Sequence, residues 1–215
     1  MLALLTALVI SAPPRPIALV ELFTSEGCSS CPPADRALAA LAQSADVTVV
    51  PLELHVDYWD SIGWRDPFSS TAFTARQAGY GPSLYTPMMV VNGGAPFVGS
   101  DRATAEAVLA RSAAKPLAVA VVRDGERLRV TVDRVDGAEV WIAVTEDHLV
   151  SAPDRGENMG RRLEHTGVVR WLGRATPGLD VPIAKAWKAD ALHVVAFAQR
   201  AGQGAVIAVG TWPKP

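Results

Sequence analysis

Charge of one sign does not accumulate anywhere in this sequence. The chain has 20 Lys and Arg against 22 Asp and Glu in 215 residues, which gives a net charge of −2. Residues 1–115 contain 7 basic and 10 acidic side chains, and residues 116–215 contain 13 and 12. A surface that binds nucleic acid needs a local excess of basic residues. The composition therefore argues against a nucleic-acid partner.

Long apolar runs are also lacking. Residues 2–10 are uncharged and apolar, but a membrane-spanning helix needs about 20 such residues. The run has the length of the apolar region of a signal peptide, and residues 10–12 resemble a cleavage site. We therefore expect residues 1–12 to be a signal peptide, the protein to be periplasmic or secreted, and the mature chain to have no membrane span. No Lys or Arg precedes the run, and the alternative is a buried N-terminal strand or helix.

Cysteine is the scarcest chemically useful residue, and both copies stand together as Cys28 and Cys31. An apolar run, residues 17–23, leads into the pair, and an alanine- and leucine-rich helical pattern, residues 34–42, follows it. A thiolate at the start of a helix faces unpaired N–H groups and the positive end of the helix dipole, which lower its pKa. Ser30 is the expected N-cap of that helix.

A redox role fits this pair better than a structural one. A disulfide between Cys28 and Cys31 closes only a four-residue loop, for which the chain-entropy model gives about 2 kcal/mol. As a redox couple, Cys28 would be the accessible nucleophile and Cys31 the resolving thiol. Metal binding is the alternative, although two cysteines without a second pair supply only two ligands where a structural zinc needs four.

The predicted secondary-structure pattern of the chain changes near residue 115. Before it, the pattern predicts a parallel strand–helix–strand unit, a further helix, a hairpin that follows Pro87, and a last helix. After it, short strands with frequent turn signals predict an antiparallel β-sandwich over residues 116–215, and we expect the polar loop 151–162 to be mobile. The predicted strands are 17–23, 47–57, 88–91, 97–98, 117–122, 127–132, 139–145, 163–172, 192–199 and 205–211, and the predicted helices are 34–42, 70–79 and 103–113.

Two further side chains are candidates for chemistry beside the cysteines. His55 ends its strand on the rim expected to carry Cys28, where ligands gather in parallel sheets. It is a candidate general base or charge partner for Cys28, a third ligand in a Cys28, Cys31 and His55 site for copper or zinc, or a structural histidine. Glu21 lies in a strand expected to be buried, which would raise its pKa and suit it to carry a proton for Cys31. In the alternative, the strand is an edge and Glu21 is solvated.

The order of elements looks like the thioredoxin fold, and the motifs are closer still to one bacterial family. That family consists of secreted thioredoxin-like proteins catalogued as domain of unknown function 1223, and the resemblance covers nearly the whole chain. The residues that carry it are Val20-Glu21-Leu22-Phe23-Thr24-Ser25, Gly27-Cys28-Ser29-Ser30-Cys31-Pro32-Pro33-Ala34-Asp35, His55-Val56-Asp57-Tyr58-Trp59-Asp60, Gly63-Trp64, Asp66-Pro67-Phe68, Arg76-Gln77, Tyr85-Thr86-Pro87, Glu157-Asn158 and Gly160-Arg161.

The resemblance implies a thioredoxin-like domain over residues 16–114, an exported protein and no established activity. It also implies that Pro87 is cis and packs against the cysteine pair, and that Thr86 offers backbone hydrogen bonds to an extended thiol substrate. Tyr58 and Trp59, in the aromatic loop after His55, are further candidates for substrate binding, or else anchors that pack the loop on the domain.

Three functions remain open from the sequence. The first is an exported thiol–disulfide oxidoreductase that uses no cofactor and acts on protein thiols or disulfides. The second is a metal-binding protein or metallochaperone that uses the same cysteines with His55. The third is a non-enzymatic protein that keeps the thioredoxin-like fold and binds a partner.

Overall fold

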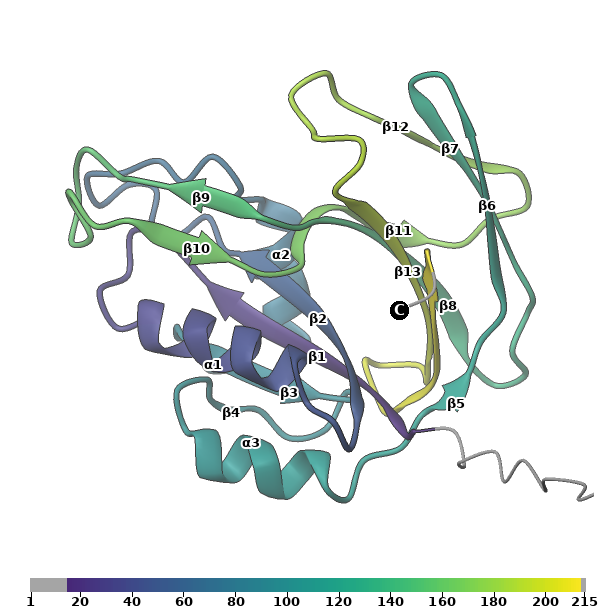
Figure 1. The fold of residues 1–215 in the computed structure, drawn as a ribbon. Helices are drawn as coiled ribbons and strands as arrows, with labels where there is room; N and C mark the ends of the chain where they lie inside the picture. The colour runs from purple at the N-terminus through teal and green to yellow at the C-terminus, as the bar shows by residue number, and fades with distance from the viewer. Residues whose placement is uncertain (1–14, 214–215) are drawn as a thin grey trace, which may run out of the picture.

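The structure is a computed structural model that describes residues 15–213, so the expected signal peptide, residues 1–12, lies outside the described residues. The first half alternates strands and helices (Figure 1). None of the described helices is long and apolar enough to cross a membrane. The elements of this half are β1 (Ile17–Thr24), α1 (Pro32–Ala42), β2 (Thr48–His55), α2 (Thr71–Ala78), β3 (Met88–Val91), β4 (Phe97–Val98) and α3 (Arg102–Leu109).

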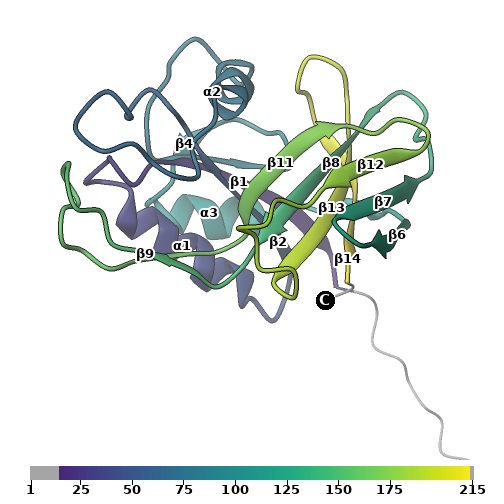
Figure 2. The same cartoon turned by 90° about the horizontal axis from the view of Figure 1, so that it is seen from above.

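Strand β1 is the centre of the first half because both of its faces are buried. It pairs in parallel with β2 and antiparallel with β3. Its even-numbered apolar residues pack against α1 and α3, and its odd-numbered ones pack with Phe73 of α2 on the other face. The continuous apolar run that predicted a strand covered on both sides is thus explained by helices α1 and α3 on one face, and by α2 together with strands of the second half on the other (Figures 1 and 2).

Helix α1 begins directly at the cysteine pair. Cys31 is its N-cap residue, with no side-chain capping bond, and prolines occupy the first two helical positions. Proline is tolerated there because those N–H groups have no helical partner. The prediction of Ser30 as the N-cap is wrong by one residue, because the Ser30 hydroxyl instead lies beside the Cys28 thiol.

The second half is built of strands. The predicted strand 163–172 is divided by Gly167, whose φ of +66° suits glycine. The elements of this half are β5 (Lys115–Pro116), β6 (Val119–Asp124), β7 (Arg127–Val132), β8 (Glu139–Glu146), β9 (Leu149–Ser151), β10 (Leu163–His165), β11 (Val168–Arg174), β12 (Leu179–Pro182), β13 (Leu192–Gln199) and β14 (Val206–Trp212).

One mixed sheet runs through both halves of the chain. Its nine strands have the order β4-β3-β1-β2-β11-β8-β13-β14-β5, and the halves join where β11 pairs in parallel with β2 at Val168 and Glu53. A separate three-stranded sheet, β12-β7-β6, packs its apolar side chains on β8 and β13. The second half therefore has two layers, as a sandwich does, but one layer continues the sheet of the first half. The division into two domains near residue 115 stays a prediction.

The β9–β10 hairpin projects back over the first half, beside α1 (Figure 1). The segment that connects these two strands contains most of the loop that we expected to be mobile. This placement brings residues from the second half to the turn that carries the cysteines.

Candidate functional site

The two cysteines are free thiols at the junction of β1 and α1. Cys28 Sγ lies 3.2 Å from Ser30 Oγ and 3.9 Å from the carbonyl oxygen of Thr86. Both cysteines have an exposed fraction of 0%. The prediction that Cys28 is accessible is therefore wrong for this structure, because the turn is packed beneath neighbouring loops.

The surroundings shift the pKa values of the two thiols in opposite directions. A hydrogen bond from Cys31, with smaller contributions from Ser30 and Thr86, lowers the pKa of Cys28 to about 6 in spite of its burial. Burial raises the pKa of Cys31 well above its ordinary value, and the neighbouring Cys28 and Asp35 add to the rise. At neutral pH, Cys28 is therefore a thiolate and Cys31 keeps its proton.

Thr86 lies beside Cys28, and Pro87 follows it with the cis geometry that the resemblance implied. The peptide bond between them is cis. Trp59 Nε1 donates a hydrogen bond of 2.8 Å to Thr86 Oγ1, which fixes the side chain of Thr86. Tyr58 Oη is buried without a hydrogen-bond partner, and its pKa is raised by burial and by the charge of the nearby thiols. These residues form one wall of the site around Cys28.

Glu21 is buried, as predicted, but on the opposite face of the sheet. It forms an ion pair with Arg76, whose Nη2 lies 3.0 Å from Glu21 Oε2, and it accepts a hydrogen bond from Tyr80. On β1, Glu21 shares its face with Leu19 and Phe23, whereas Thr24, which adjoins Cys31, is on the other. The structure therefore does not place Glu21 where it can take a proton from Cys31.

The buried carboxyl group that adjoins Cys31 is that of Asp35. Thr24 Oγ1 donates a hydrogen bond of 2.8 Å to Asp35 Oδ1, and Thr24 is also among the groups that affect the Cys31 thiol. Burial and the nearby Glu53 raise the pKa of Asp35 to about 8. The sequence carried a signal for this residue, because Asp35 is four positions after Cys31 and thus on the same face of α1.

His55 belongs to a buried chain of alternating acidic and basic groups. Asp66 Oδ2 lies 2.7 Å from His55 Nδ1, and His55 Nε2 lies 3.1 Å from Glu53 Oε1. The same Glu53 oxygen lies 2.6 Å from His165 Nδ1, and His165 Nε2 lies 3.3 Å from Glu26 Oε1. The side chains of all five are at most 1% exposed. We name these residues the histidine–carboxylate chain.

Each member of this chain shifts the protonation of its neighbours. Burial by itself would lower the pKa of both histidines, but Asp66 and Glu53 raise the pKa of His55 well above its ordinary value. Glu53 and Glu26 likewise raise the pKa of His165 to about 9. Burial would raise the pKa of Glu53, but His165 and His55 hold it at about 2. Within the histidine–carboxylate chain, each buried charge thus lies beside a charge of opposite sign.

Residues far along the sequence hold the cysteine turn in place. The buried Asn158 donates two hydrogen bonds of 2.8 Å, one to the carbonyl of Glu26 and one to that of Cys28. Glu157 Oε2 accepts a hydrogen bond of 2.9 Å from the Ser29 N–H. The loop that we expected to be mobile therefore packs on the cysteine turn. Local pattern carries no signal for these contacts, because they join residues about 130 positions apart in the sequence.

The proposed metal ligands Cys28, Cys31 and His55 are not brought together. Within residues 15–213, one group of three side chains offers ligand atoms within 4.8 Å of one another, and it consists of Glu53, His55 and His165. Both nitrogens of His55 are taken by carboxylates of the chain. The sequence gives no signal for His165 in this group, because it lies 110 positions after His55 and shares no motif with it.

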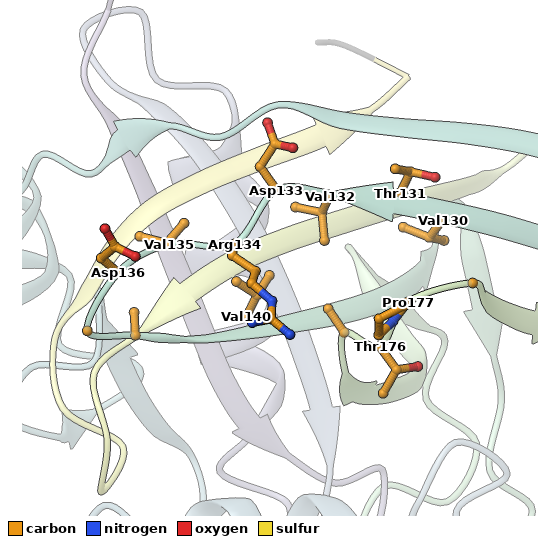
Figure 3. A pocket seen from close by; sticks show the side chains of 14 residues that line it. Val130, Thr131, Val132, Asp133, Arg134, Val135, Asp136, Val140, Thr176 and Pro177 are labelled. Atoms are coloured by element: carbon orange, nitrogen blue, oxygen red, sulfur yellow. The ribbon is translucent and has the colours of Figure 1, made fainter.

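The pocket of about 550 Å³ shown in Figure 3 lies away from these groups in the fold. It is lined by the β7–β8 connection, including Arg134, and by the β11–β12 connection, including Thr176 (Figure 3). Neither cysteine lines it, nor does a member of the histidine–carboxylate chain. The candidate site is therefore the packed junction around Cys28 rather than this pocket.

Two solved structures are similar to this one. A protein from Agrobacterium tumefaciens, AGR_C_4864, has a TM-score of 0.69 and 26% identity, over 93% of this chain and 95% of its own. HBP35 of Porphyromonas gingivalis has a TM-score of 0.63 and 15% identity, over 95% of this chain and 77% of its own, and shows likeness of fold alone. No curated protein matches the chain. The family model described as Protein of unknown function (DUF1223) matches residues 19–199, and the chain therefore belongs to that family.

Proposed function

We propose that this protein is an exported, thioredoxin-like thiol–disulfide oxidoreductase that oxidises protein dithiols. The observation that supports the proposal most is the asymmetry of the pair: two adjacent free thiols, of which Cys28 has a lowered pKa and Cys31 a raised one. A stabilised thiolate favours the reduced form of a dithiol, so the oxidised form is a good electron acceptor. Export rests on the signal-like residues 1–12.

The reaction starts from the Cys28–Cys31 disulfide. A substrate thiolate attacks Cys28 Sγ, which forms a mixed disulfide and breaks the Cys28–Cys31 bond, so that Cys31 leaves as a thiolate and takes up a proton. A second thiolate of the substrate then attacks the substrate sulfur of the mixed disulfide and expels the Cys28 thiolate. The substrate loses two electrons and becomes a disulfide, the protein becomes the dithiol seen here, and an external disulfide reoxidises it.

Asp35 is the group suited to supply the proton that Cys31 takes up. Its raised pKa of about 8 keeps the carboxyl group protonated near neutral pH, which is the state that a proton donor needs. Thr24 contacts Asp35 and adjoins Cys31, so its hydroxyl is placed to pass the proton between them. This role replaces the one that the sequence suggested for Glu21.

Substrate recognition would involve the wall of residues Tyr58, Trp59, Thr86 and Pro87. The Thr86 carbonyl lies 3.9 Å from Cys28 Sγ, so a peptide bound there would present its sulfur to the nucleophile. Because Cys28 is fully buried, the turn and its covering segment must separate before a protein substrate can react. Asn158, which bonds the carbonyls on both sides of Gly27, is the contact that such an opening must break.

The proposal is tested with a Cys31→Ser variant mixed with exported proteins under non-reducing conditions. We expect mixed disulfides through Cys28 that a reductant dissolves, and none with the Cys28→Ser, Cys31→Ser double variant. We also expect the oxidised wild-type protein to form disulfides in a reduced model protein. Absence of both the trapped complexes and the dithiol oxidation would refute the proposal.

A further inference from the structure

Glu53, His55 and His165 place their possible ligand atoms within 4.8 Å of one another, and neither cysteine belongs to this group. Glu53 Oε1 lies 3.1 Å from His55 Nε2 and 2.6 Å from His165 Nδ1. The three come from β2 and β10, so the two halves of the chain each contribute. Two histidines and one glutamate are a known zinc ligand set, which leaves one position of a tetrahedral ion for a water molecule.

The groups around these three side chains are those that orient metal-bound histidines. In metal sites the second ring nitrogen of a histidine usually donates to a carboxylate, which fixes the ring. Asp66 Oδ2 lies 2.7 Å from His55 Nδ1, and Glu26 Oε1 lies 3.3 Å from His165 Nε2. Each histidine thus has a carboxylate on its outer nitrogen and Glu53 on its inner one. The Thr166 N–H donates to the other Glu53 oxygen at 2.7 Å, which fixes the glutamate as well.

One oxygen in this cluster lacks the partner that its burial demands. Glu26 Oε1 is buried and makes no hydrogen bond: His165 Nε2 lies 3.3 Å from it but also lies 3.2 Å from Ser151 Oγ. An unsatisfied buried carboxylate oxygen is costly. Two ligands of one tetrahedral zinc ion lie about 3.3 Å apart, as bond lengths of ~2.0 Å require. The 2.6 Å contact between Glu53 Oε1 and His165 Nδ1 must therefore open by about 0.7 Å on binding. This movement of the ring toward Glu26 would satisfy the orphan oxygen.

We propose that Glu53, His55 and His165 bind one Zn²⁺ ion, held in a buried site that joins the two halves of the protein. The ion takes the place of the protons that the two imidazoles share with Glu53. The ion would hold β10 against the end of β2 and thereby hold Glu26, which precedes the cysteine turn. This proposal is independent of the redox proposal, because no cysteine is a ligand.

The test uses the full-length mature protein with both Cys28→Ser and Cys31→Ser, so that thiols cannot contribute. We expect about one equivalent of zinc by elemental analysis, and the visible absorption of four-coordinate Co²⁺ when the zinc-free protein is titrated with cobalt. We also expect zinc to raise the melting temperature of this protein. Failure to bind either ion would overturn the proposal and leave the redox proposal untouched.

Substitution of single ligands locates the ion. His165→Gln and Glu53→Gln should each weaken Co²⁺ binding by more than about tenfold, since even outer-shell partners contribute ~10–100-fold. His193→Gln is the matched control, because His193 also pairs with a carboxylate, Asp147 at 3.2 Å, but lies outside the cluster. Cobalt affinity unchanged in both cluster variants, or equally reduced in the control, would refute the site. If the cluster variants do not fold, the cobalt titration of the double cysteine variant decides alone.

Discussion

The pKa of Cys28 is the most direct test of how this fold tunes its thiols. We expect the ultraviolet absorbance of the thiolate to titrate with a pKa of about 6 in the wild-type protein. At pH 7 such a thiol is about 90% ionised, whereas a thiol of ordinary pKa near 9 would be about 1% ionised. Absorbance suits this buried residue better than alkylation because it does not require a reagent to reach the sulfur. The titration of Tyr58 does not interfere, since burial raises its pKa above the ordinary value of 10.0.

Two neighbours, Cys31 and Ser30, account for the lowering of the Cys28 pKa. Cys31 provides the largest contribution, and Ser30 Oγ, 3.2 Å from Cys28 Sγ, provides a smaller one. A hydrogen bond to a charged group contributes about 1.5–3 kcal/mol, and each pKa unit corresponds to about 1.4 kcal/mol. Ser30→Ala should therefore raise the pKa of Cys28 by about 1 to 2, and Cys31→Ala should raise it further.

The control is Cys28→Ser, in which the low-pH step of the absorbance must vanish. Ser29→Ala is the matched control for the hydroxyl, because Ser29 is exposed and interacts through its backbone N–H rather than its side chain. The reasoning is refuted if the wild-type step lies near pH 9, or if Ser30→Ala and Cys31→Ala leave the step in place.

Three further outcomes follow from the same geometry. Asn158→Ala should lower the free energy of unfolding, measured with denaturant, by about 2–5 kcal/mol, since it leaves the buried carbonyls of Glu26 and Cys28 without donors; a change below ~0.5 kcal/mol would contradict this. Asp35→Asn should slow dithiol oxidation by about 10²-fold or more because it removes the proton donor for Cys31, and an unchanged rate would exclude that role. The unfolding free energy of the wild type, relative to that of Cys28→Ser, should rise with pH between about 6 and 9. In that window the Cys28 thiol holds its proton in the unfolded state but not in the folded state, because folding lowers its pKa. A fall across this window would contradict the assignment.

The sequence was informative wherever structure is encoded locally. The apolar run, the cysteine pair and the alanine-rich pattern predicted β1, the turn and α1, and the strand pattern after Pro87 predicted the β3–β4 hairpin. These predictions hold because strand, turn and helix preferences depend on residues a few positions apart. The expected approach of Thr86 to Cys28 came from resemblance rather than from periodicity.

Side-chain partners were decided by the tertiary structure. The sequence showed that Glu21 lies in a buried strand, but only the position of α2 gives it Arg76 as a partner and places it away from Cys31. Similarly, the period of β2 put Glu53 and His55 on one face, yet it could not show that His165 reaches them.

Taken by itself, the sequence determined the local elements, the family resemblance and the position of the thiols before a helix. The tertiary structure decided that one sheet continues through both halves, that Asn158 and His165 complete the surroundings of the cysteine turn, and that Cys28 is buried. The reason is physical. Pairing between β2 and β11 joins the backbone edges of two strands that meet only after the intervening chain has folded. Periodicity reports which face of a strand is buried, but not which strand lies beside it or what the face is buried against.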